Sequence, residues 1–255
     1  MRHPLAKHPL AGAYARIDRA DRHLDELKLV IERFRKAEQD KLISQHQRVP
    51  WQLLGPGDKI TGVLKSRLLN DFPLDAAVVV GEVIYNLRAA LDYLIYELAW
   101  EDSGTEKHGT QFLIESVEVD RKDKKRGFKP RSETCFAGLR ADHINALELL
   151  QPYKGCTWTK TLRDISNPDK HRRLTAIGGT SEALSTVECG ISENLNDRPR
   201  KILRGRGASY ADTHTHLQYT LQVTLPNGAD IVKTLEILKR EVRATIDAFK
   251  PEFKV

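Results

Sequence analysis

Residues 74–100 are the most hydrophobic stretch of this 255-residue chain, and they limit the folds that it can adopt. Large apolar side chains recur here at alternating steps of three and four residues, which predicts a helix buried along one face. The positions are Val80, Ile84, Leu87, Leu91, Leu94 and Leu98. We therefore expect a core helix around which the rest of the chain packs.

Helical spacing also appears at both ends of the chain. Residues 13–46 carry one apolar seam on a charged surface, which predicts a long N-terminal helix. Residues from about 233 to 250 predict a closing C-terminal helix. Shorter helices are expected at 140–152 and 157–166, with a charged loop at 101–133.

After residue 171 the composition shifts to Thr, Val, Ile and Tyr, which favour strands. Pro226-Asn227-Gly228 predicts a hairpin turn. The expected strands are 174–178, 184–191, 217–225 and 229–232, with a weaker candidate at 60–64.

The predicted fold class is α+β, with a helical bundle packed against a small antiparallel β-meander. The bundle contains the long N-terminal helix and the central core helix, and the C-terminal helix closes it. We expect a single domain over 1–255, its helical part at about 13–166 and its strand part at about 172–232.

The composition indicates a globular protein, with 40% hydrophobic and 30% charged residues. No apolar run of membrane-spanning or signal-peptide length is present, so we expect a cytoplasmic protein that does not contact membranes. The three cysteines form no C-x-x-C motif and are expected to be free thiols. Nothing in the sequence indicates a cofactor.

The net charge of +6 is concentrated in clusters. Residues 121–131 hold seven Lys or Arg against one Asp, and residues 198–206 hold five against none. Such clusters attract phosphate-rich partners such as RNA, although they are also typical of solvated loops. The candidate nucleic-acid-binding residues are Lys124, Lys125, Arg126, Arg172, Arg173, Arg200 and Lys201.

Two polar groups of residues carry candidate chemistry. On the core helix, Arg88 and Asp92 are four residues apart and therefore share a face beside the apolar seam. An ion pair that only fixes the helix is the alternative interpretation.

The second group is Arg163 with Asn167, Asp169, Lys170 and His171. Asn167-Pro168-Asp169 is typical of a helix start, so a single helical turn is expected there. The imidazole of His171 could move protons and the cations could hold a phosphate, while a capped turn with a solvated basic face is the alternative.

A third, weaker pattern is Asp212-Thr213-His214-Thr215-His216. In a strand, Asp212, His214 and His216 would share one face, as metal ligands can. Loop residues without metal are the favoured interpretation, so no metal site is predicted.

The stretch from Gly81 to Asp92, then Gln151-Pro152-Tyr153 and Asn167 to Arg172, resembles an uncharacterised family of bacterial proteins common in actinobacteria. Its members show G-[DE]-x-x-x-N-L-R-x-A-L-D and N-x-D-K-H-R motifs. More distantly, Arg163-Asp164 followed by His171 is similar to the HEPN superfamily, helical bundles that include metal-independent ribonucleases of toxin and phage-defence systems. The spacer here is longer than in that superfamily and contains Pro168.

Two functions follow as expectations. The first is a metal-independent nuclease-like or RNA-binding protein, in which His171 is the general acid/base and the cations stabilise phosphate charge. The second is a non-catalytic homodimeric scaffold, in which the motif residues form a structural polar network. The network would contain Asn86, Arg88, Asp92, Asn167, Asp169 and His171.

Overall fold

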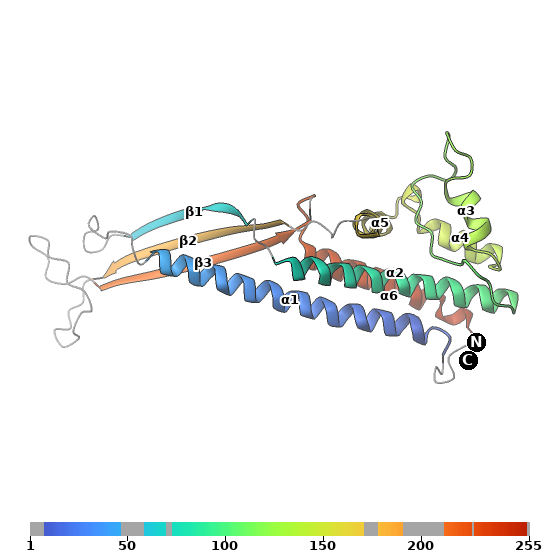
Figure 1. Cartoon of the computed structure of the whole chain (residues 1–255), viewed down its shortest axis with the longest axis horizontal. Helices are drawn as coiled ribbons and strands as arrows, with labels where there is room; N and C mark the ends of the chain where they lie inside the picture. Colours follow the sequence, from blue (N-terminus) through green and yellow to red (C-terminus); the bar gives the residue numbers. More distant parts are fainter. Residues whose placement is uncertain are drawn as a thin grey trace, which may run out of the picture. The chain divides into compact units, whose positions relative to one another are not determined.

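The computed structural model describes residues 8–46, 59–69, 73–170, 178–190, 212–225 and 227–253 (Figure 1). The helices are α1 (Ala11–His46), α2 (Leu74–Ser103), α3 (Phe128–Cys135), α4 (Ala141–Leu149), α5 (Thr157–Lys170) and α6 (Ile231–Phe249), with 3-10 helices η1 (Pro152–Lys154) and η2 (Lys250–Glu252). The strands are β1 (Lys59–Leu69), β2 (Gly178–Gly190) and β3 (Asp212–Thr224).

The chain divides into two compact units. Unit 1 comprises residues 1–30, 73–177 and 225–255, and unit 2 comprises residues 31–72 and 178–224. Compactness by contact does not establish independent folding, so the single domain over 1–255 stays a prediction.

Unit 1 is built on α2, whose apolar face is buried as the spacing predicts. Val80, Leu87 and Leu94 have no exposed surface. Helix α6 packs on α2, and the N-terminal part of α1 contacts α2 through Arg16–Asn86 and His23–Glu82 (Figure 1). Helix α1 runs antiparallel to α6, because Tyr14 bonds to Asp247 while Lys28 pairs with Glu236.

Helix α6 begins directly after the turn that the sequence analysis interprets as a hairpin. The Asp230 carboxylate accepts a hydrogen bond from Lys233 N–H at 2.9 Å and caps the helix. The chain turns tightly before it, since Gly228 N–H donates to the Leu225 carbonyl at 2.8 Å. Residues 231–232 therefore start a helix and do not form a returning strand.

Unit 2 contains a three-stranded antiparallel sheet in the order β1-β2-β3. Strand β2 pairs with β3 from Gly178↔Thr224 to Gly190↔Asp212, and with β1 up to Lys59↔Glu188. The β1–β2 register shifts between Leu64 and Arg67. Strand β1 precedes α2 in the chain, so this pairing joins segments that are distant in sequence.

The predicted fold class is wrong in its β part. The structure is mostly helical and the helical bundle is confirmed, but the predicted β-meander is not seen, because β1 and β2 are separated in the chain by α2 to α5 and are not successive strands of a meander. The expected strands at 174–178 and 184–191 are replaced by one strand, 178–190, and the expected strand at 229–232 is absent from the described residues. Unit 1 closes its core with its own helices and loops, without the expected meander.

Two local predictions also differ from the structure. Helix α5 continues through Pro168 to Lys170, so Asn167 does not begin a helix there. The expected loop at 101–133 contains the start of α3. Among the described residues, no helix combines the length and apolarity that crossing a membrane requires.

Candidate functional site

Arg88 and Asp92 both hydrogen-bond to the backbone of one residue, Phe112. The Asp92 carboxylate accepts from Phe112 N–H at 2.8 Å, and Arg88 Nη2 donates to the Phe112 carbonyl at 3.1 Å. Phe112 is itself buried. One face of α2 thus fixes the extended stretch of residues 111–116, here called the 111–116 segment.

Gln151 holds the same segment from the other side. Its side chain is fully buried, and Nε2 donates to the carbonyls of Leu113 and Leu147 at 3.0 Å each. Its Oε1 accepts from Glu115 N–H at 2.9 Å. Asp92 and Gln151 belong to motifs that are 59 residues apart in sequence. Both motifs therefore contact the 111–116 segment, which belongs to neither of them.

A polar pocket of about 500 Å³ lies against the 111–116 segment. It is here called the arginine pocket, because three arginines from separate parts of unit 1 line it. Its residues are Arg88 from α2, Gln111 to Glu115, Arg131 from α3, and Arg163, Asp164 and Ser166 from α5.

Arg88 has an unsatisfied donor at this pocket. Its Nε is buried and has no hydrogen-bond partner among the described residues. Burial lowers the pKa of the Arg88 guanidinium, the charge of Asp92 raises it, and the charge of Arg131 lowers it. Arginine stays protonated at neutral pH, so two like charges face each other here. An anion bound between them would relieve this repulsion.

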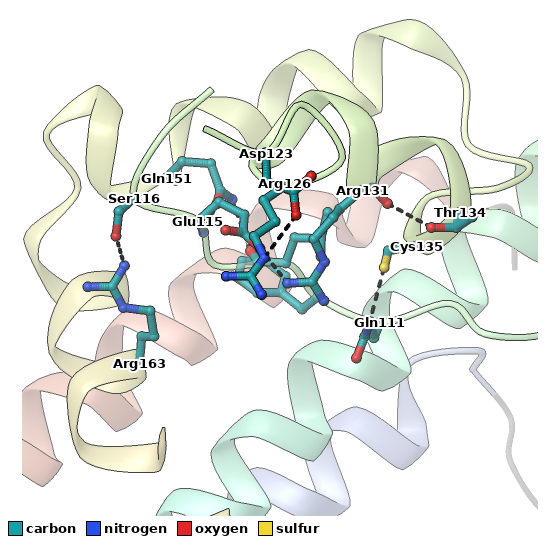
Figure 2. A network of polar contacts seen from close by, with 12 residues as sticks. Gln111, Glu115, Ser116, Asp123, Arg126, Arg131, Thr134, Cys135, Gln151 and Arg163 are labelled. Atoms are coloured by element: carbon teal, nitrogen blue, oxygen red, sulfur yellow. Dashed lines mark hydrogen bonds and ion pairs between the residues drawn. The ribbon is translucent and has the colours of Figure 1, made fainter. Parts of the chain in front are cut away.

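The other two arginines are held by partners at the pocket wall (Figure 2). Arg131 pairs with Glu115, and Arg163 bonds to Ser116 and to Asp164. Each guanidinium carries five N–H donors, so these contacts leave others for a ligand.

The loop of residues 117–127 carries the basic cluster. Asp120 accepts hydrogen bonds from the backbone N–H groups of Lys122 and Asp123, which lower the pKa of its carboxyl. Gly127 closes the loop with φ +107°, where a Cβ would lie 2.7 Å from the Glu118 carbonyl oxygen. Lys124, Lys125 and Arg126 are exposed on this loop and do not line the arginine pocket.

The structure thus brings Arg88 and Arg163, one from each of the two candidate polar groups, to one pocket, and Asp92 bonds to Phe112 in its lining. Asn167, Asp169 and Lys170 lie in the last turn of α5, and their side chains lie outside the described residues. His171, Arg172, Arg173, Arg200 and Lys201 also lie outside them. Asp212, His214 and His216 occupy alternate positions of β3. In the part of the chain whose side chains are described, no group of three or more His, Cys, Asp or Glu could hold a metal ion.

A second pocket, of about 490 Å³, lies on the other flank of Arg88. It is here called the tyrosine pocket and is lined by Arg16, Tyr85, Arg88, Ala89, Asp92, Tyr93, Tyr96 and Thr110. The guanidinium carbon of Arg16 lies 5.8 Å from the Tyr85 ring centroid and 5.7 Å from that of Tyr93. Asn86, buried in the motif helix, accepts from Arg16 Nη1 at 3.3 Å. The sequence analysis missed this group because Arg16 comes from α1.

Sequence reasoning also missed a buried polar cluster at the far end of α2. His143 Nδ1 lies 2.7 Å from Asp102 Oδ2, and both side chains are almost completely buried. Arg140 contacts His143 Nε2 at 2.9 Å and bonds to Glu252. The cluster ties α2 to α4 and to the C-terminal η2. Neither Asp102 nor His143 stands in a recognisable motif, so no sequence signal marked them.

Comparison of this chain with protein-family models, with curated proteins and with solved structures finds no match, so its function must be argued from the two pockets beside Arg88.

Proposed function

We propose that this protein binds RNA and that the arginine pocket receives a backbone phosphate. The observation that carries the proposal is the convergence of Arg88, Arg131 and Arg163 on one polar pocket. Guanidinium groups form strong bidentate hydrogen bonds with phosphate oxygens. Arg131 belongs to the basic cluster at 121–131, whose exposed lysines would attract the rest of the strand.

We propose further that bound RNA is cleaved without a metal ion, with His171 as general acid/base. Arg163 and Ser166 line the pocket, and α5 continues from them to Lys170, next to His171. The ribose 2′-hydroxyl would attack the adjacent phosphorus and the bond to the 5′-oxygen would break, with His171 taking the proton from the attacking hydroxyl or giving one to the leaving oxygen. Arg88 and Lys170 would stabilise the charge that develops on the phosphate. Asn167 and Asp169 would position these groups.

Binding is tested with a short fluorescein-labelled single-stranded RNA by anisotropy. Loss of one charge-assisted contact is worth about 1.5–3 kcal/mol, so Arg131→Gln and Arg163→Gln should each weaken binding by roughly tenfold to 140-fold. Arg240→Gln is the matched control, because it removes an exposed arginine of α6 that does not line the pocket. Equal affinities for all four proteins would contradict the proposal.

Cleavage is tested separately with the same RNA in the presence of a chelator. Wild-type protein should cleave it and His171→Ala should not, while both bind it with similar affinity. If RNA is bound but cut equally slowly by both proteins, the binding proposal stands and the catalytic one fails.

A second function, a structural polar network, is favoured by the contacts of Asp92 and Gln151. Both side chains satisfy backbone groups of the 111–116 segment. Under this alternative, substitutions there would destabilise the protein, and RNA affinity would not depend on Arg163. Unfolding and binding measurements on the same variants therefore separate the two functions.

A further inference from the structure

Resting on the proposed RNA binding, we infer that the tyrosine pocket is a stacking site for an unpaired nucleobase next to the phosphate bound in the arginine pocket. The substrate would then be single-stranded RNA and not a duplex. The inference starts from the rings and cation that α2 and α1 bring together.

Tyr85 offers an open aromatic surface. Its side chain is 60% exposed although it lies on the core helix, and Tyr93, eight residues on, is 40% exposed. Tyr85 and Tyr93 line one pocket together with Tyr96, so their exposed rings form a connected aromatic surface, which indicates a binding site. Nucleobases stack readily on such rings, whatever their sequence.

Arg16 completes this surface with a positive charge. Its guanidinium lies over both tyrosine rings, and Asn86 holds it from within α2. Gly12, one turn before Arg16, leaves room for the Tyr93 ring, since a Cβ there would lie 3.2 Å from Tyr93 Cδ1. A guanidinium plane beside tyrosines also stacks on bases and attracts the strand.

Arg88 connects the two pockets. It lines both, and its neighbour in this contact, Phe112, lines the arginine pocket. A nucleotide whose phosphate meets Arg88 from the arginine pocket would therefore have its base near the tyrosine pocket. In a duplex the bases are paired and stacked inside, so only an unpaired nucleotide could use both pockets.

The test compares two labelled probes of equal length by anisotropy, a single-stranded oligouridine and an abasic oligonucleotide with the same phosphates. Stacking contributes enough that wild-type protein should bind the oligouridine about fivefold to 140-fold more tightly. Tyr85→Ala should lower the affinity for oligouridine toward the abasic value and leave the abasic affinity unchanged. Tyr85→Phe keeps the ring and should bind both probes like wild type. Because Tyr85 is exposed, neither change threatens the core.

The outcomes separate the two proposals. If wild type and Tyr85→Ala bind both probes alike, the stacking site is wrong while phosphate binding stands. If Arg163→Gln does not weaken binding of the abasic probe, phosphate binding in the arginine pocket is wrong, and the stacking inference falls with it. If a matched RNA duplex binds as tightly as oligouridine, the preference for unpaired nucleotides is wrong.

Discussion

The Asp92 carboxylate and the backbone N–H of Phe112 are joined by a hydrogen bond of 2.8 Å. Arg88, one turn earlier on α2, bonds to the carbonyl of the same residue. Side chains four residues apart leave a helix on one face, so a single turn of α2 satisfies both polar groups of Phe112. Phe112 lines the arginine pocket, Asp92 lines the tyrosine pocket, and Arg88 lines both.

Replacing Asp92 should destabilise the protein. Asp92→Ala leaves the Phe112 N–H without its acceptor and Arg88 without a nearby negative charge, which should lower the free energy of unfolding by about 1–3 kcal/mol. Urea unfolding measures the change. Asp25→Asn, at an exposed ion pair of α1, should change it by less than about 0.5 kcal/mol. A loss equal to that of the control would show that the Phe112 contact contributes little.

Gln151→Leu should loosen the 111–116 segment locally as well as lower stability. The Glu115 N–H and the Leu113 carbonyl lose their partner, at about 1–3 kcal/mol for a group left unpaired, while the Leu147 carbonyl still accepts from Leu150 N–H. Amide hydrogen exchange should accelerate at Glu115 beyond the global change. Glu133→Leu, at an exposed position of α3, is the control. Unchanged protection at Glu115 would contradict this role.

Gly127→Ala should disturb the basic loop. An alanine at this position would have to adopt a positive φ, which L-residues disfavour. Its Cβ would also lie only 2.7 Å from the Glu118 carbonyl oxygen. Gly109 also has a positive φ, +76°, but no atom lies within 4 Å of its Cβ position. Gly109→Ala should therefore cost only the backbone strain, about 1–2 kcal/mol, and Gly127→Ala should cost more. Similar melting temperatures for the two variants would contradict the close approach.

Glu252 should contribute to stability in a pH-dependent way. Its hydrogen bond to Arg140, helped by His143, lowers the pKa of this carboxyl below the ordinary 4.5, although burial opposes the shift. A lowered folded-state pKa adds stability above pH 4.5, and that stability is lost as the pH falls through the folded value. The difference in unfolding free energy between wild type and Glu252→Gln should therefore shrink on acidification. Glu133→Gln, at an exposed position of α3, is the control. If the difference in unfolding free energy between wild type and Glu252→Gln stays constant with pH, the prediction is wrong.

Salt dependence offers a further check on the arginine pocket. Binding to single strands weakens with salt by a slope of about 0.7 per neutralised phosphate. If Arg131 neutralises one phosphate, Arg131→Gln should reduce the slope by about 0.7, and Arg240→Gln should leave it unchanged. Anisotropy titrations across a salt series measure the slopes, and identical slopes for wild type and Arg131→Gln would remove Arg131 from the contact.

Parts of the site could be predicted because some residues share a helix face. Arg88 and Asp92 were expected to act together from their spacing, and the structure joins both to Phe112. Arg131 stood in a basic cluster, but nothing in the sequence indicated that it would face Arg88. Arg16 meets Tyr85 and Tyr93 only because α1 packs antiparallel to α2.

The amino-acid sequence by itself determined the three long helices of the bundle, since burial of one face at a period of 3.6 residues is a local property of α1, α2 and α6. The sheet and the two pockets were decided by tertiary structure. Strand β1 ends at Leu69 and its partner β2 begins 109 residues later, at Gly178. No local sequence pattern specifies such a distant partner. The pockets likewise bring together side chains from α1, α2, α3 and α5, whose proximity depends on how the helices pack and not on their spacing in the chain.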